Sequence, residues 1–266
     1  MSHSFFWVDA FTDRVFSGNP AGVVPLERWL PDEAMQRIAF ENGLSETAFL
    51  VRTGPGQFHL RWFTPAVEVE LCGHATLASA HVLWTELGEK AGTLTFASRS
   101  GPLLVTRLAD GRLELDFPAM APASENAATA LSAVTAALEQ PPLWLGRTRF
   151  DLLAVLPDAA QVRALRPNYA HVAAAGGRGL IVTAPGGEDC DFVSRFFAPQ
   201  SGVPEDPVTG SAHCALAPYW AGRLGKTRLH ARQVSARGGE LWCELRGDRV
   251  GIAGRAVTYL RGTLHV

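Results

Sequence analysis

The sequence predicts an α+β fold made of two pseudo-symmetric halves, each a curved, mostly antiparallel sheet wrapped around a central apolar helix. Three observations carry this prediction. The motif "RWFTP" at residues 61–65 returns as "RFFAP" at residues 195–199, 134 positions later. Two segments, "ATLASAHVLWTEL" and "AHCALAPYWAGRL", are apolar nearly all round, which indicates buried helices. The strands come in runs rather than in strict alternation with helices, which argues against a doubly wound sheet.

The internal echo extends beyond these motifs. "GHA" at residues 73–75 matches "GSA" at residues 210–212 with an offset of 137, and the order holds into the later hairpin strands. A repeat of this length predicts a duplicated unit. We therefore expect an N-terminal half over residues 1–118, to which a C-terminal strand at about 256–266 returns, and a C-terminal half over residues 119–255.

The first half opens with the strand "FFWVDAF" and continues with an amphipathic helix. Pro31 stands at the helix start, apolar residues follow at helical spacing, and Asn42-Gly43 ends it. The strands "ETAFLV" and "FHLRWF" come next, then the apolar helix. Two strands around an Asp110-Gly111 turn close this half as a hairpin.

The second half follows the same order, with the strands "RFDLLAVL", "GLIVTA" and "DFVSRFF" before its apolar helix. Between the halves, "PAMAPASENAATALSAV" indicates a linker and then a helix capped by Ser124. Pro218 lies inside the second apolar helix, and proline removes a helix hydrogen bond. We expect a kink or an early end there.

Composition narrows the class of protein. The chain has 266 residues, 47% of them hydrophobic, and a net charge of −2, so nothing favours nucleic acid or an anionic membrane as a partner. No apolar run approaches the ~18 residues of a membrane span, and the first residues do not form an export signal. The four cysteines show neither paired zinc spacing nor a C-x-x-C motif. We expect reduced thiols in a cytoplasmic protein.

Glycines begin both apolar helices, as Gly73 in "CGHAT" and Gly210 in "VTGSA". The first helical turn has free backbone N–H groups at the positive end of the dipole, and glycine lets a ligand approach them. If the halves pack about a pseudo-two-fold axis, the two helix starts meet at a cleft suited to a carboxylate or an enolate. Ordinary capping by Thr76 and Ser211 is the alternative.

The two copies differ in their ionisable residues. Glu46 corresponds to Leu180, Cys72 corresponds to Thr209, and Asp206 falls in a three-residue insertion of the second half. The frame is duplicated but the carboxylate is not, which suits a proton removed and returned by one group. Burial in an apolar cleft would raise the pKa of Glu46 toward a useful range.

Each of these residues also has a purely structural interpretation. Glu46 can be an exposed strand-edge residue, His74 a structural helix-start histidine, and Asp206 a turn former before a proline. His74, His81 and His213 together with Cys72 invite a metal interpretation, but their spacing is not that of a standard ligand set. We predict no metal site, and we expect His81 and His213 to be packing residues. The sequence has no nucleotide-binding glycine motif, so no nucleotide cofactor is expected.

Four stretches together resemble the PhzF-like phenazine-biosynthesis family, within the diaminopimelate-epimerase fold. They are "VDAFTDRVFSGNPAGVV", "GLSETAFLV", "RWFTPAVEVELCGHATLASAHVL" and "EDPVTGSAHCALAPYWA", which lie between residue 8 and about residue 221. The resemblance implies two halves with the active site between them, a homodimer, and a cofactor-free isomerase acting on a small carboxylate. The namesake of the family moves a proton within trans-2,3-dihydro-3-hydroxyanthranilate.

The resemblance also implies roles for single residues. Glu46 would shuttle the proton, His74 and Asp206 would assist, Ser211 would supply a hydroxyl, and Gly73 and Gly210 would donate backbone N–H groups to the substrate carboxylate. The epimerases of this fold use one cysteine per half. Cys72 lies at the first place, and residues 207–209 offer none at the second. Two alternatives stay open: an amino-acid epimerase or racemase that uses Cys72, and a non-catalytic protein that binds small carboxylates.

Overall fold

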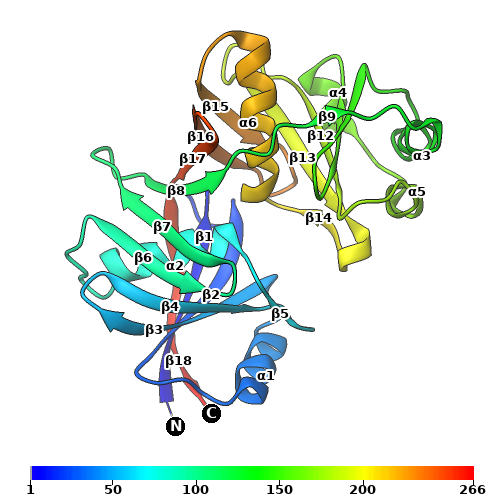
Figure 1. The fold of residues 1–266 in the computed structure, drawn as a ribbon. Helices are drawn as coiled ribbons and strands as arrows, with labels where there is room; N and C mark the ends of the chain where they lie inside the picture. The colour runs from blue at the N-terminus through cyan, green and yellow to red at the C-terminus, as the bar shows by residue number, and fades with distance from the viewer. Residues whose placement is uncertain (1) are drawn as a thin grey trace. The chain divides into compact units, whose positions relative to one another are not determined.

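The computed structural model describes residues 2–266 and divides them into two compact units (Figure 1). Unit 1 contains the residues up to Asp116 together with Ala253–Val266, and unit 2 contains Phe117–Ile252. Most strand pairings in both units are antiparallel, and each unit holds one buried apolar helix. The predicted α+β fold class is therefore confirmed.

Unit 1 is built on a sheet that places helix α2 (Gly73–Thr85) against strands β1, β2, β3 and β18. Strand β1 pairs with β18 and β2 antiparallel, β2 pairs with β3 parallel, and β4 pairs with β3 antiparallel and with β6 parallel. The strands are β1 (Ser2–Ala10), β2 (Asn19–Leu26), β3 (Glu46–Gly54), β4 (Gln57–Phe63), β5 (Glu68–Val69), β6 (Thr93–Ser98), β7 (Gly101–Arg107), β8 (Leu113–Pro118) and β18 (Ala256–His265).

Helix α1 (Asp32–Asn42) forms as its sequence predicts. Pro31 precedes its first turn, and Gly43 ends it in the left-handed conformation with φ of 62°. That conformation strains residues with a Cβ atom, which is why glycine ends so many helices. Met35 and Ile38 lie on the apolar face of α1 and pack with Phe49 of β3 in a small hydrophobic core. This packing fixes the chain that leads into Glu46.

Unit 2 places helix α6 (Gly210–Leu224) against strands β15 and β16. Strand β11 pairs with β12 parallel, and β13 pairs with β12 antiparallel and with β15 parallel. The remaining elements are β9 (Ala123–Ser124), α3 (Ala128–Leu138), β10 (Trp144–Arg147), β11 (Leu152–Val155), α4 (Ala159–Ala164), α5 (Tyr169–Ala174), β12 (Leu180–Pro185), β13 (Phe192–Ala198), a 3-10 turn (Pro199–Ser201), β14 (Val203–Asp206), β15 (Arg228–Gln233), β16 (Gly239–Arg246) and β17 (Arg249–Gly254).

The early helix end expected at Pro218 does not occur, because α6 continues through it to Leu224. A proline cannot donate to the carbonyl four residues before it, here that of Cys214. The backbone N–H of Met120 donates to this carbonyl instead, at 2.9 Å. A tertiary hydrogen bond therefore replaces the one that the proline removes.

The helix cap expected at Ser124 is also wrong. Helix α3 begins after Ala127, and Ser124 belongs to strand β9, where it pairs with Gly146 of β10. The hydroxyl of Ser124 accepts a hydrogen bond from the indole N–H of Trp144 at 3.3 Å. Strand pairing thus competes successfully for the residue that the local pattern assigns to a cap.

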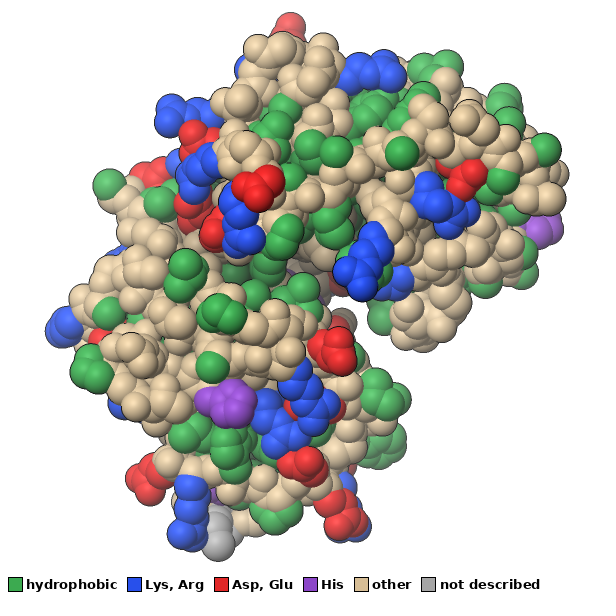
Figure 2. All heavy atoms as spheres, in the orientation of Figure 1, with side chains coloured by type: hydrophobic (Ala, Val, Ile, Leu, Met, Phe, Trp, Pro, Cys, Tyr) green, Lys and Arg blue, Asp and Glu red, His purple; other side chains and the backbone are tan. Residues whose placement is uncertain are grey.

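Charges are mixed on the face of the molecule that Figure 2 shows. Lys and Arg side chains alternate with Asp, Glu and apolar side chains there, and the coloured residues form no large basic patch on that face. Among residues 2–266, none of the helices has the length and apolar character needed to cross a membrane.

Candidate functional site

Glu46 is the first residue of β3, where it pairs with Ala21 of the parallel strand β2. Its carboxylate oxygen Oε2 lies 3.2 Å from Nε2 of His74, the second residue of α2. Both side chains are largely buried. Unit 1 therefore holds a shielded carboxylate against the first turn of its central helix, as the sequence predicts for Glu46 and His74.

The imidazole of His74 is held from its other side as well. The side-chain amide nitrogen of Asn19, the first residue of β2, lies 3.2 Å from Nδ1, and the Cys72 sulfur lies 3.5 Å from the same atom. An amide nitrogen can only donate, so Nδ1 accepts when the ring is neutral. A neutral His74 then carries its proton on Nε2, facing Glu46.

The titration of His74 and Cys72 reflects this enclosure. Burial alone lowers the pKa of His74, but Cys72 and the Glu46 carboxylate more than offset it, and the pKa lies well above the ordinary range. Burial, reinforced by the negative charge of Glu46, raises the pKa of Cys72 to about 11. At neutral pH Cys72 is therefore a thiol and not a thiolate, whereas the raised pKa of His74 favours the charged imidazole.

These three side chains are also those a metal ion could use. One ligand atom each from Glu46, Cys72 and His74 lies within 4.8 Å of the others. Sulfur, nitrogen and oxygen together are a ligand set that Zn²⁺ accepts. In the geometry seen here both ring nitrogens of His74 face protein groups, Asn19 and Cys72 on one side and Glu46 on the other. Metal binding would have to displace one of those contacts.

In unit 2, Asp206 ends β14, three residues before Thr209, the residue that precedes α6. The carboxylate oxygen Oδ2 of Asp206 accepts from the Thr209 hydroxyl at 2.6 Å. Gln233, which is buried, donates to the Asp206 backbone carbonyl at 2.7 Å and accepts from the Thr209 backbone N–H at 2.9 Å. These bonds fix Asp206 beside the start of α6.

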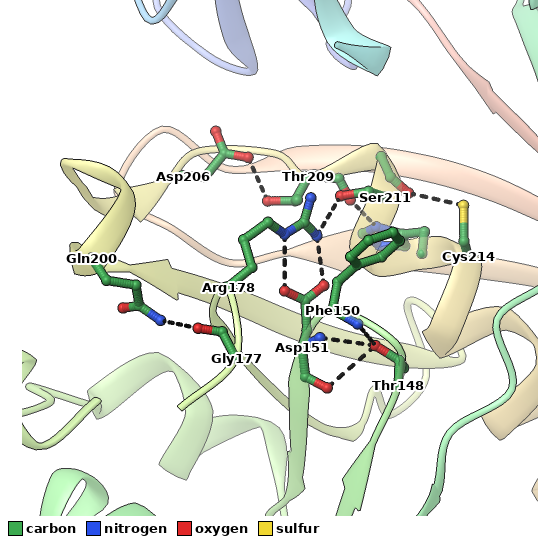
Figure 3. A network of polar contacts seen from close by, with 12 residues as sticks. Thr148, Phe150, Asp151, Gly177, Arg178, Gln200, Asp206, Thr209, Ser211 and Cys214 are labelled. Atoms are coloured by element: carbon green, nitrogen blue, oxygen red, sulfur yellow. Dashed lines mark hydrogen bonds and ion pairs between the residues drawn. The ribbon is translucent and has the colours of Figure 1, made fainter. Parts of the chain in front are cut away.

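Ser211 lies in the first turn of α6 and is contacted by an arginine. Its hydroxyl oxygen accepts from Nη2 of Arg178 at 2.9 Å (Figure 3). Arg178 also donates from Nε and Nη2 to the two carboxylate oxygens of Asp151, at 3.0 and 2.5 Å. The start of the second central helix therefore carries a hydroxyl held by a partly exposed arginine, which is paired with the buried Asp151.

Ordinary side-chain capping does not explain the residues at the helix starts. Cys72 and Thr209 occupy the cap positions of α2 and α6, and neither makes a side-chain cap hydrogen bond. The Thr76 hydroxyl instead donates back to the Cys72 carbonyl at 2.6 Å. Gly73 and Gly210 are the first helical residues, as expected, so their backbone N–H groups lie at the positive helix ends.

The structure thus brings Glu46, Gly73 and His74 together in unit 1, and Asp206, Gly210 and Ser211 together in unit 2. His81 and His213 have the packing roles expected of them: His81 contacts the Thr258 hydroxyl at 3.0 Å, and His213 contacts the Thr209 carbonyl at 2.8 Å.

Four polar residues of these networks were not singled out from the sequence: Asn19, Asp151, Arg178 and Gln233. Two of them offered a usable signal. Asn19 begins one strand of the parallel pair β2–β3, and Asp151 directly precedes β11, a strand of the parallel pair β11–β12. A polar residue that leads into a buried strand is a candidate for such a network.

Known proteins resemble this chain over nearly its whole length. The family model described as "Phenazine biosynthesis-like protein" matches residues 8–262. An uncharacterized isomerase of Pseudomonas aeruginosa is 54% identical, and the match covers 100% of both chains. This chain is a member of the PhzF-like phenazine-biosynthesis family.

Solved structures of the PhzF family extend the comparison. The PhzF-family phenazine biosynthesis protein of Enterococcus faecalis superposes with a TM-score of 0.95 at 46% identity, over 100% of both chains. A hydroxyproline epimerase of Agrobacterium vitis shares the fold at 10% identity, with a TM-score of 0.61 over 99% of this chain and 92% of that one. The PhzF-like family membership and the epimerase-like fold that the motifs imply are therefore confirmed.

Proposed function

We propose that this PhzF-like protein is a cofactor-free isomerase that moves a proton within a small cyclic or unsaturated carboxylate, with Glu46 as the proton shuttle. The contact between Glu46 and His74 is the observation that carries the proposal. It joins a shielded carboxyl group to an imidazole whose pKa is raised, and a histidine with a perturbed pKa next to such a group is typical of acid–base sites. The isomerase name of the P. aeruginosa relative supports the reaction class.

In the proposed isomerisation one group acts twice, first as the base that removes the proton and then as the acid that returns it. The Glu46 carboxylate takes a proton from a saturated carbon next to the double bonds that are conjugated with the substrate carboxylate, and the C–H electron pair moves into this conjugated system. The carboxylic acid so formed returns the proton to a different carbon, and the double bond has moved without oxidation or reduction.

The comparison of the two units supports a single base. The parallel pair β2–β3 begins with Ala21 opposite Glu46, and the parallel pair β11–β12 begins with Leu152 opposite Leu180. Leucine thus occupies the place of the glutamate in unit 2. This matching register also supports our proposal that the units arose by duplication.

We assign the substrate carboxylate to the backbone N–H groups of Gly73 and Gly210, and we assign helper roles to Asp206 and Ser211, as the family resemblance implies. Glycine at a helix start is suited to this, because the positive end of the helix favours an anion. We also propose that the protein is a homodimer, for which sedimentation velocity is the direct measurement.

Turnover of trans-2,3-dihydro-3-hydroxyanthranilate by the wild type and Glu46→Gln tests the reaction. Glutamine keeps the shape and the hydrogen bonding but cannot take the proton, so the rate constant should fall by about 10² to 10⁴. Affinity for 2-aminobenzoate, a non-reacting carboxylate, should change little. Glu41→Gln, on the exposed face of α1, is the matched control and should keep full activity.

The alternative based on Cys72 has one observation in its favour, the 3.5 Å contact between the Cys72 sulfur and His74. A pKa of about 11 keeps that sulfur protonated and a poor base at neutral pH. Cys72→Ser should therefore retain most of the activity. An active Glu46→Gln together with an inactive Cys72→Ser would replace the carboxylate mechanism by the thiol one.

A further inference from the structure

Arg178 is held in unit 2 by an unusually close turn. Gly176 and Gly177 precede it with φ of 83° and 81°, a conformation that favours glycine. A Cβ atom at Gly177 would lie 3.0 Å from the Phe150 carbonyl, so only glycine lets the two segments approach. The Arg178 backbone N–H donates to that same carbonyl at 2.6 Å. The turn thereby aims the arginine side chain across to Asp151.

Only some of the hydrogen-bond donors of the Arg178 guanidinium bind protein groups. Nε and Nη2 donate to Asp151, Nη2 also donates to Ser211, and Phe150 and Phe196 lie 5.7 and 5.4 Å from the guanidinium carbon. Its other terminal nitrogen, Nη1, donates to no residue in the range 2–266, and Figure 3 shows it pointing away from the Asp151 carboxylate. The side chain is 39% exposed, so this donor is fixed in place and reachable.

Arg195 of the same unit shows what a purely structural arginine looks like. Its Nε and Nη2 bind Glu205, and its Nη1 donates to the carbonyl of Leu165 at 2.8 Å. The Arg195 side chain is almost fully buried and has each of its nitrogens in use. The need to balance the buried charge of Asp151 therefore explains why Nε and Nη2 of Arg178 face that carboxylate. It does not explain why Nη1 is left without a protein acceptor among residues 2–266.

The hydroxyl of Ser211 adds a second donor at the same place. Because its oxygen accepts from Arg178, its own proton is directed elsewhere. The N–H groups of Nη1 and the Ser211 hydroxyl can each donate to one oxygen of a carboxylate, and charge-assisted bonds of this kind are stronger than neutral ones. Asp151 is only 1% exposed and lies behind the arginine, so it orients the cation without facing the ligand.

We propose that Arg178 is the specificity-determining residue of unit 2, which binds the substrate carboxylate together with Ser211 and so selects acids over their neutral analogues. This inference rests on the proposed function and names its ligand class more sharply. The corresponding residue of unit 1, with the offset of 134 that relates the two arginine motifs, is the buried Leu44. The cation is thus a feature of one unit only.

Calorimetric titration with 2-aminobenzoate and with the neutral 2-aminobenzamide tests the proposal. The wild type should prefer the acid. Arg178→Gln should lose about 10- to 100-fold in affinity for the acid, the range expected for a charged hydrogen bond, and little or nothing for the amide. Arg178→Lys should recover part of the preference. Arg228→Gln, in which a highly exposed arginine of the same unit loses its bond to Glu244, is the matched control and should bind like the wild type.

Loss of Arg178 leaves Asp151 buried without its partner, which can unfold the unit. The double variant Arg178→Gln with Asp151→Asn removes that charge, and it should fold and show the same loss of preference. If a folded variant keeps the full preference for the acid, the role of Arg178 is refuted. The proposed reaction is tested independently, by the turnover of Glu46→Gln. If the wild type itself shows no preference for the acid, both the carboxylate assignment and this inference fail.

Discussion

Nε2 of His74 lies 3.2 Å from the carboxylate oxygen Oε2 of Glu46, and both groups are shielded from water within unit 1. Asn19 holds the opposite ring nitrogen at 3.2 Å. Strands β2 and β3 and helix α2 each supply one member of this trio. The acid–base chemistry we propose is therefore positioned by the rigid elements of a single unit, and no loop has to close to form the contact.

The contact between His74 and Glu46 should make stability depend on pH. The pKa of His74 is raised in the folded state, so the native protein binds a proton that the unfolded chain releases above about pH 6.5. The stabilisation is fully present at pH 6 and is lost as the pH rises through the raised pKa. Urea unfolding of the wild type and Glu46→Gln should show a stability difference that shrinks as the pH rises above 6. A difference independent of pH would mean that His74 is neutral throughout.

His213 should act in the opposite direction. Burial lowers its pKa to about 4, and the hydrogen bond to the Thr209 carbonyl offsets only part of this effect. The unfolded chain takes up a proton below about pH 6.5, so stability present above that pH is lost as the pH falls toward 4, by about 3 kcal/mol for a shift of this size.

His213→Gln isolates this contribution, because an amide can still donate to the Thr209 carbonyl but does not titrate. The gap in unfolding free energy between the wild type and the variant should narrow or reverse between pH 8 and pH 4.5. His81, whose pKa burial also lowers to about 4, titrates in both proteins and so cancels from the comparison. A constant gap over that range would contradict the assignment.

Local pattern was enough to predict the two central helices, their glycine starts and the helix that ends at Gly43. These features depend on residues within one or two turns of each other. It was not enough at Pro218 and Ser124, where a hydrogen bond from Met120 and pairing with Gly146 decide the outcome.

The site divides in the same way. Glu46 and His74 could be singled out because they differ from their counterparts in an otherwise repeated frame. Arg178 could not, because Ser211, its partner at the helix start, is 33 residues away along the chain. Asn19 offered a signal as a polar residue that leads into a buried strand, but its partner His74 is 55 residues away, and a single sequence does not tell which polar residues meet over such a separation.

The arginine that recurs in the motifs "RWFTP" and "RFFAP" has a recurring partner. Arg61 donates from Nε to Glu68 at 2.7 Å, and Arg195 donates from Nε to Glu205 at 2.7 Å. In both units the arginine lies on the long strand before the central helix, and the glutamate lies on the short strand paired with it. The pair therefore ties down the chain that leads to each helix start, and in unit 2 that chain includes Asp206.

Arg195→Met should destabilise the protein strongly, because it leaves Glu205 mostly buried without its cation. Breaking a buried ion pair by removing one partner costs about 3–5 kcal/mol. The double variant Arg195→Met with Glu205→Gln removes the stranded charge and should recover a large part of that loss in urea unfolding. It should still bind 2-aminobenzoate less tightly than the wild type, since Asp206 has lost the anchor beside it.

Arg228→Met is the matched control, because it breaks a pair on a highly exposed arginine, and it should cost at most about 1 kcal/mol of stability. Equal losses of unfolding free energy for Arg195→Met and Arg228→Met would show that the pair between Arg195 and Glu205 does not hold strand β14 in place.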